Sequence, residues 1–139
     1  MRVIVMVKAN EEIEGGALPS EEDMSEMLAF NEELVKAGVM LAAEGLHPSS
    51  RGVRVVFSGR ERKVVDGPFA ETKELLAGYW LWQVRSMDEA VEWAKRIPNP
   101  TGAEGVVEIR QVVESGELGE SPELREKEER LRREAETRG

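Results

Sequence analysis

The sequence contains no cysteine and only one histidine, His47. Without cysteine the chain has no disulfide bond, no thiolate metal site and no cysteine nucleophile. One imidazole and a set of carboxylates that lack the spacing of a calcium loop do not make a metal site, so we expect no metal ion. A glycine-rich phosphate loop and a serine nucleophile elbow are also missing, and the sequence predicts no cofactor.

Basic residues and long apolar runs are scarce as well. The chain has 19 Lys and Arg against 28 Asp and Glu, a formal net charge of −9. Because nucleic-acid binding requires a basic patch that displaces counterions from phosphates, we expect no direct contact with nucleic acid. The apolar opening, residues 1–8, is too short for a membrane span or a signal-peptide core. We therefore expect a cytoplasmic protein without membrane contact, whose 139 residues suffice for one domain.

Alternating apolar residues predict the strands of a sheet. Residues 1–8 and 78–84 are apolar at both alternating sets of positions, which is typical of central strands. Gly59 lies between two short β-branched runs and predicts a hairpin turn. Residues 11–19 are polar and predict a loop. The expected strands are 1–8, 39–44, 53–58, 61–65, 78–84 and 105–113.

Two helices are marked by their caps. Ser20 precedes apolar residues at helical spacing, and this helix ends before Gly38. Ser86 and Glu89 have the spacing of a capping box, and Pro98 ends the helix that they open. The order β, α, β, hairpin, β, α, β predicts an α+β fold of the ferredoxin-like type, an antiparallel sheet with two helices on one face and an inserted hairpin.

Residues 116–139 differ in character from the domain that we expect over residues 1–115. This C-terminal extension is densely charged, and from Pro122 on its large apolar residues are Leu124 and Leu131, seven positions apart. Such a stripe is too narrow to anchor a helix on a core. The extension is either a solvated helix or one whose two leucines seal an oligomer contact.

A count of sheet faces predicts a homodimer. Two helices cover one face of the sheet, yet the strands at 3–7 and 79–84 are apolar on both faces. Leaving the second face in water would expose more apolar surface than a monomer usually tolerates, at about 1.5–3 kcal/mol per large side chain. We expect two copies to pack through these sheet faces. The alternative is that the second face lines a cavity roofed by loops and tail.

Three stretches carry a family resemblance: "AGVMLAAEGLHPS", "VVDGPFAETKELLAGYW" and "SMDEAVEWAKRIPNP". They resemble the DGPF group of the YCII-related proteins, and the match runs from residue 1 to about residue 114. The resemblance implies a dimeric α+β barrel, in which two ferredoxin-like sheets pack face to face. Many DGPF proteins have no established activity, and some are encoded beside or fused to extracytoplasmic-function sigma factors, which implies an accessory role with a sigma factor as partner.

The resemblance to smaller YCII-type proteins implies an enzyme, because a His and Asp pair in the pocket of those proteins has been proposed to be catalytic. Their histidine lies in the first helix, and residues 20–37 of this chain contain none. The aspartate is transferable to Asp66, and His47 would be its partner only if the fold brings the two together. In that case Asp66 would orient the imidazole, which would act as general base.

Each of these two residues also has a structural interpretation. Asp66 starts an Asp-Gly-Pro turn, where aspartate commonly hydrogen-bonds the backbone two residues on. His47 precedes Pro48, which favours extended backbone in a surface loop. The sequence leaves both interpretations open.

Five further residues are candidates for binding a ligand. Glu44 ends a strand, and Arg54 could bind a carboxylate or phosphate. Glu71 and Lys73 follow the turn, where they could line a pocket mouth or form a solvated helical turn. Tyr79 could belong to an aromatic ligand wall or to the core.

Two functions are consistent with these features. One is a cofactor-free enzyme that performs acid–base chemistry on a small organic molecule in a pocket near Asp66. The other is a non-enzymatic ligand-binding or regulatory protein, for example one associated with a sigma factor. The sequence does not identify the small molecule.

Overall fold

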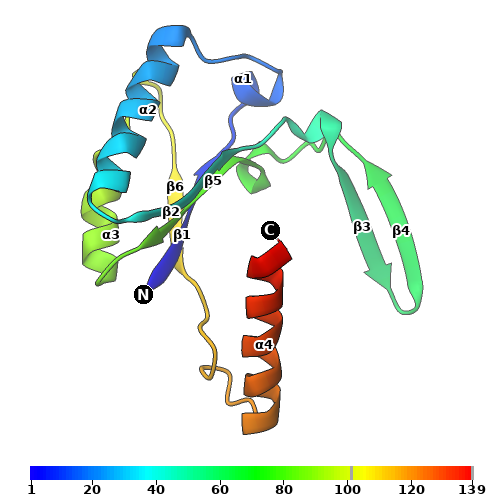
Figure 1. Cartoon of the computed structure of the whole chain (residues 1–139). Coiled ribbons are helices and arrows are strands. Elements are labelled where there is room, and N and C mark those ends of the chain that lie inside the picture. The colour runs from blue at the N-terminus through cyan, green and yellow to red at the C-terminus, as the bar shows by residue number, and fades with distance from the viewer. Residues whose placement is uncertain (101, 139) are drawn as a thin grey trace.

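The computed structural model describes residues 1–100 and 102–138. Its main sheet has four antiparallel strands in the order β2-β5-β1-β6, so the two strands that are apolar on both sides are central, as predicted. This sheet with its helices confirms the ferredoxin-like α+β fold (Figure 1). The strands are β1 (Arg2–Lys8), β2 (Met40–Gly45), β5 (Leu76–Gln83) and β6 (Val107–Gln111).

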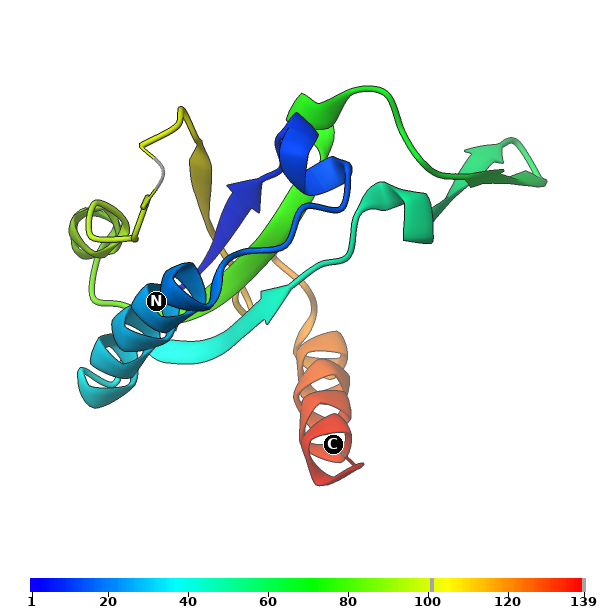
Figure 2. The same ribbon diagram turned by 90° about the horizontal axis from the view of Figure 1, so that it is seen from above.

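The two predicted helices lie on one face of this sheet (Figure 2). They are α2 (Glu21–Lys36) and α3 (Met87–Ala94). The side chains of Ser20 and Ser86 accept the predicted capping hydrogen bonds from backbone N–H groups three residues on. Both caps therefore act as the sequence indicates.

The predicted loop over residues 11–19 is wrong at its start. Residues Glu11–Glu14 form a short helix, α1. The side chain of Asn10 accepts a hydrogen bond of 2.8 Å from the N–H of Ile13 and so begins this turn. A single helical turn is too short to show a periodic apolar pattern, and the cap was the available signal.

The core lies between the sheet and the helices α2 and α3. Val3, Val5 and Trp82 are fully buried, and Phe30 of α2 meets Trp80 edge-on with ring centroids 5.9 Å apart. Burying each of these side chains contributes about 1.5–3 kcal/mol. The core therefore packs the two central strands, β1 and β5, against α2.

The opposite face of the sheet has no helix packed on it within the described chain. Ile4, Met6 and Leu81 point to this side and are half-buried, and Leu41 is 51% exposed. Helix α4 (Pro122–Arg138) lies on this side in both views, but Leu124 and Leu131 remain 60% and 50% exposed (Figures 1 and 2). The C-terminal helix thus leaves its own narrow apolar stripe in water.

The predicted hairpin forms a separate two-stranded sheet that stands away from the main sheet (Figure 1). It consists of β3 (Val53–Ser58) and β4 (Glu61–Asp66), and Gly59 supplies the positive φ of 60° at the turn. Phe57 is 70% exposed. Two single-turn 3-10 helices flank the hairpin at Ser49–Arg51 and Thr72–Glu74.

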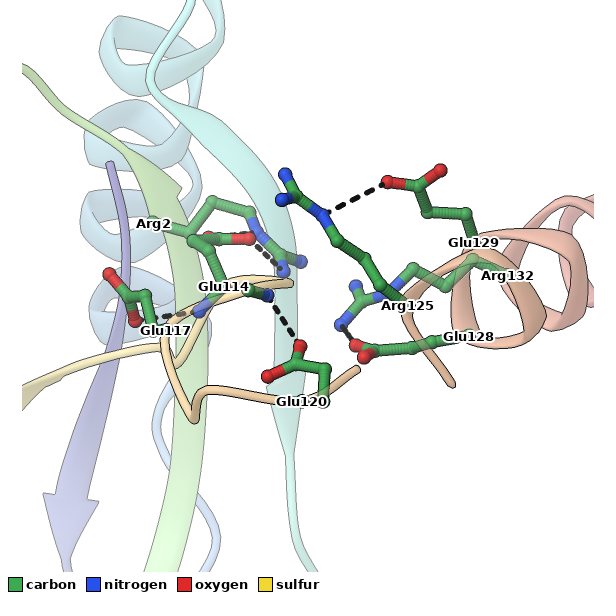
Figure 3. Close-up of polar contacts among 9 residues, drawn as sticks. Arg2, Glu114, Glu117, Glu120, Arg125, Glu128, Glu129 and Arg132 are labelled. Atoms are coloured by element: carbon green, nitrogen blue, oxygen red, sulfur yellow. Dashed lines mark hydrogen bonds and ion pairs between the residues drawn. The ribbon is translucent and has the colours of Figure 1, made fainter. Parts of the chain in front are cut away.

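Polar contacts lie at both ends of the segment that links β6 to α4 (Figure 3). Arg2 of β1 forms a bidentate pair with Glu114, with N···O distances of 2.9 and 3.0 Å. The hydrogen bonds to Arg2 lower the pKa of Glu114 and raise that of Arg2. Arg125 and Arg132 pair with glutamates of their own helix.

Within the described ranges, no helix has the length and hydropathy needed to cross a membrane.

Candidate functional site

A cavity of about 680 Å³ opens where α1, the first half of α2 and the ends of β2 and β5 meet. This volume is within the range of sites that hold small organic molecules. Residues 98–100, which follow α3, close one side of it. We refer to it as the ligand cavity.

The inner wall of the ligand cavity is apolar and is fixed by one polar contact. Met24, Met27 and Trp80 line it, and Trp80 is almost fully buried. The indole N–H of Trp80 donates a hydrogen bond of 2.8 Å to Oδ1 of Asn31. Because indole can only donate, this bond fixes the orientation of the Asn31 amide and ties α2 to β5 behind the wall.

Three of the residues predicted from the sequence lie at the rim of this cavity. Glu44 and Tyr79 are register partners across β2 and β5, and His47 follows two residues after β2. Glu44 and His47 are exposed, whereas Tyr79 is half-buried. Because Ala43 and Trp80 face the core, the side chains of their neighbours Glu44 and Tyr79 point to the opposite, uncovered face of the sheet. Glu44 and Tyr79 therefore border the cavity at the sheet edge without directing their polar groups toward Trp80.

The imidazole of His47 lies against an arginine. Its two ring nitrogens are 3.1 and 3.2 Å from Nη1 of Arg51, four residues further on. A guanidinium group can only donate, so the ring nitrogen that binds it acts as an acceptor. Among the residues that the structure describes, no hydrogen bond or ion pair joins His47 to Asp66.

Asp66 itself ends β4 outside the ligand cavity. Its carboxylate is exposed and has no hydrogen bond or ion pair within residues 1–100 and 102–138. Asp66 and His47, the pair predicted from the sequence, are therefore not in contact through their polar groups: His47 lies against Arg51, whereas Asp66 is exposed.

Residues 66–69, the DGPF turn, are fastened to the loop before the hairpin through Ser49. The N–H of Phe69 donates to the Ser49 hydroxyl at 3.0 Å, and the N–H of Gly67 donates to the carbonyl of Gly52 at 2.9 Å. A Cβ on Gly67 would lie 1.7 Å from the Ser49 carbonyl oxygen, so only glycine fits here. The turn therefore holds two backbones in very close approach.

Ser49 continues this connection to α1. Its hydroxyl donates to the carboxylate of Glu14, and its N–H donates to Oε2 of the same residue at 3.0 Å. The hydroxyl accepts from Phe69 at the same time, so one serine joins the DGPF turn to α1. Glu14 and the cavity-lining Ile13 are neighbours on that helix.

The other three predicted residues lie near the hairpin base and do not line the cavity. The guanidinium of Arg54 is 3.9 Å from the ring centroid of Phe69 and 3.9 Å from the carboxylate of Glu74. Glu71 and Lys73 are exposed beside the 3-10 turn at 72–74. Their surroundings are those of a solvated turn.

Sequence reasoning missed the contribution of α1 and α2 to the cavity. Met24 and Met27 show in the sequence only as apolar residues at helical spacing, and Glu12 as part of a polar stretch. Neither pattern indicates the wall of a cavity. The available signal was Asn31, a polar residue that continues the spacing of the two methionines on the same face of α2. A polar residue within an apolar stripe indicates that this helix face contacts a polar group, which here is the indole N–H of Trp80.

Charge around the ligand cavity has one sign. The acidic residues Glu12 and Asp23 line it, and no Lys or Arg does so in the part of the chain that the structure describes. The described residues also hold no group of three His, Asp or Glu side chains arranged for a metal ion. The chemistry of the rim is therefore that of carboxylates and one imidazole.

Comparison with known proteins places this fold in a family. The YCII-related domain matches residues 1–115. An uncharacterized protein of Rhizobium meliloti (strain 1021) is 35% identical over 114 residues, which cover 78% of this chain and 92% of the relative. The match includes all four strands of the main sheet, the hairpin and the ligand cavity. The chain belongs to the family of proteins with a YCII-related domain.

Proposed function

We propose that the protein binds a small organic molecule in the ligand cavity. The observation that carries this proposal is a cavity of about 680 Å³ with an apolar inner wall and a polar rim. His47 at the rim would set the orientation of the ligand, while Met24 and Met27 would contact its apolar part.

Acid–base chemistry on the bound molecule is the finer form of this proposal. Its support is that His47, a side chain of the type that commonly transfers protons, lies at the rim. Asp66 lies outside the cavity, and it would take part only with a ligand that reaches from the rim to the end of β4. The alternative, regulation through a partner such as a sigma factor, rests on family resemblance alone.

A fragment screen by saturation-transfer NMR tests the binding function. Met24→Trp places a larger side chain on the cavity wall, at a position that is half exposed and so tolerant of the change. Leu28→Trp is the matched control, because Leu28 is on the same helix, is exposed and does not line the cavity. We expect fragments that bind the wild type to lose binding in Met24→Trp and to keep it in Leu28→Trp. Equal binding by both variants would contradict the proposal.

We also propose that two copies associate through the uncovered sheet face. Ile4, Met6 and Leu81 form an apolar surface there that no helix of the described chain covers. In sedimentation velocity we expect a dimer for the wild type and a folded monomer for Met6→Glu. Val91→Glu on the exposed side of α3 is the control and should leave the dimer intact. A wild type that sediments as a monomer would exclude this assembly.

A further inference from the structure

We infer that the ligand of this cavity is an organic cation, a protonated amine carried on an apolar body. The inference rests on the binding function proposed above and assigns the chemical class of the ligand. Three features of the cavity carry it: unpaired carboxylates, the charge of the surrounding segment and the chemistry of the inner wall.

The carboxylates come from two different elements. Glu12 belongs to α1 and Asp23 to the first turn of α2. Both residues line the cavity, and neither is in an ion pair in the described part of the chain. The guanidinium of Arg51 lies against His47 and is not itself a lining residue. The described residues that line the cavity thus include negative groups and no Lys or Arg as a counterion.

The segment around these carboxylates strengthens the same field. Residues 11–26 contain seven Asp and Glu and no Lys, Arg or His. A cleft lined by one sign of charge, with low-dielectric walls, concentrates ions of the opposite sign. An anionic ligand would meet repulsion here, and it would find no lining arginine or lysine to bind it.

The inner wall suits the apolar part of such a cation. Met24 and Met27 are polarizable and adapt to irregular shapes. Trp80 closes this wall behind the methionines and is itself almost fully buried. A hydrocarbon body against the methionines with an ammonium group at the acidic rim would satisfy both parts of the cavity.

Three probes of similar size and different charge test the inference: phenethylammonium, phenethyl alcohol and hydrocinnamate. Dissociation constants are measured by NMR titration at low ionic strength, where surface charges are least screened. We expect phenethylammonium to bind about fivefold more tightly than the alcohol, the upper end of the effect of a solvent-exposed charge pair. Hydrocinnamate should bind most weakly.

Charge-neutral variants locate the effect. In Glu12→Gln/Asp23→Asn the preference for the cation over the alcohol should disappear, while the alcohol should bind as before. The matched control is Glu123→Gln/Glu126→Gln, which removes the same charge from exposed positions of α4. This control should keep the preference, because α4 does not line the cavity.

The outcomes separate the class of ligand from the binding function. Equal affinities for the three probes, or tightest binding of hydrocinnamate, would overturn the cation inference and leave the binding function in place. Loss of the preference in both double variants would also overturn it, since the effect would then be one of net charge. Failure of all three probes to bind would overturn the inference, and the Met24→Trp screen would decide the binding function independently.

Discussion

The DGPF turn and the ligand cavity lie on either side of α1, and they are built in opposite ways. The turn is a continuous, distinctive string in which Gly67 and Phe69 touch the loop at Ser49 through backbone atoms. The cavity is assembled from α1, α2, β2 and β5, and no continuous string encodes it. The contrast teaches that a conspicuous motif can mark a tight backbone constraint, while the site with room for a ligand lies beside it.

The largest expected effect comes from adding one methyl group to the DGPF turn. Gly67→Ala would place a Cβ 1.7 Å from the Ser49 carbonyl oxygen, so the backbones must separate. We expect a loss of about 3 kcal/mol in the free energy of unfolding, at the upper end for overpacking, measured by urea denaturation. Gly52→Ala is the control, because its Cβ would lie 3.5 Å from the same oxygen. Equal stability of the two variants would show that the close approach does not constrain the turn.

A smaller loss is expected from Ser49→Ala. This change removes the acceptor of the Phe69 N–H and one donor to Glu14, while the Ser49 N–H still binds that carboxylate. Leaving such groups unsatisfied costs about 1–3 kcal/mol. Hydrogen exchange should become faster in the β3–β4 hairpin, because the DGPF turn at its base loses the hydrogen bond from Phe69 to Ser49. Unchanged exchange there would mean that the hairpin is held by other contacts.

The junction of Arg2 and Glu114 gives a pH-dependent effect remote from both regions. Hydrogen bonds to Arg2 lower the pKa of Glu114, so its contribution to stability is present above the ordinary glutamate pKa of about 4.3. This contribution is lost as the pH falls through the lowered value. The pair is partly exposed, which limits its contribution to about 1 kcal/mol or less.

Glu114→Gln tests this pH dependence by thermal melting between neutral and acidic pH. The variant should lose stability at neutral pH and approach the wild type in acid, where Glu114 is protonated. Identical melting differences at both ends of the range would show that the pair does not contribute through its charge.

The smallest effect is expected from Asp66→Asn. The Asp66 side chain is exposed and has no polar partner in the described residues, so stability should change by less than about 0.5 kcal/mol. Affinity for ligands of the cavity should also be unchanged, because Asp66 does not line it. A large loss of binding in this variant would place the site at the DGPF turn instead.

The sequence predicted most of the fold because its signals are local. The alternation in residues 78–84 identified a central strand, Ser20 and Ser86 identified helix starts, and Gly59 identified the hairpin turn. The helix α1 escaped because one turn has no period. Coverage of the second sheet face by another copy stays a prediction.

The site could be predicted only in part, because a cavity is a property of packing. Glu44, His47 and Tyr79 are candidates from strand ends and residue chemistry, and all three border the cavity, although Glu44 and Tyr79 direct their side chains to the opposite face of the sheet. Their meeting with Glu12, Asp23 and the two methionines depends on how α1 and α2 sit on the sheet. The contact between His47 and Arg51 could not be predicted either, because it depends on the 3-10 turn at 49–51.

The most direct measurement is a map of backbone amide chemical shifts during titration with phenethylammonium. Binding in the ligand cavity predicts that Ile13, Met24 and Ala43, which line it, shift together and saturate with one dissociation constant. The amides of Gly67 and Phe69 in the DGPF turn should shift far less. Saturating shifts centred on Gly67 and Phe69, with Met24 and Ala43 unmoved, would contradict the account and make the turn the binding site.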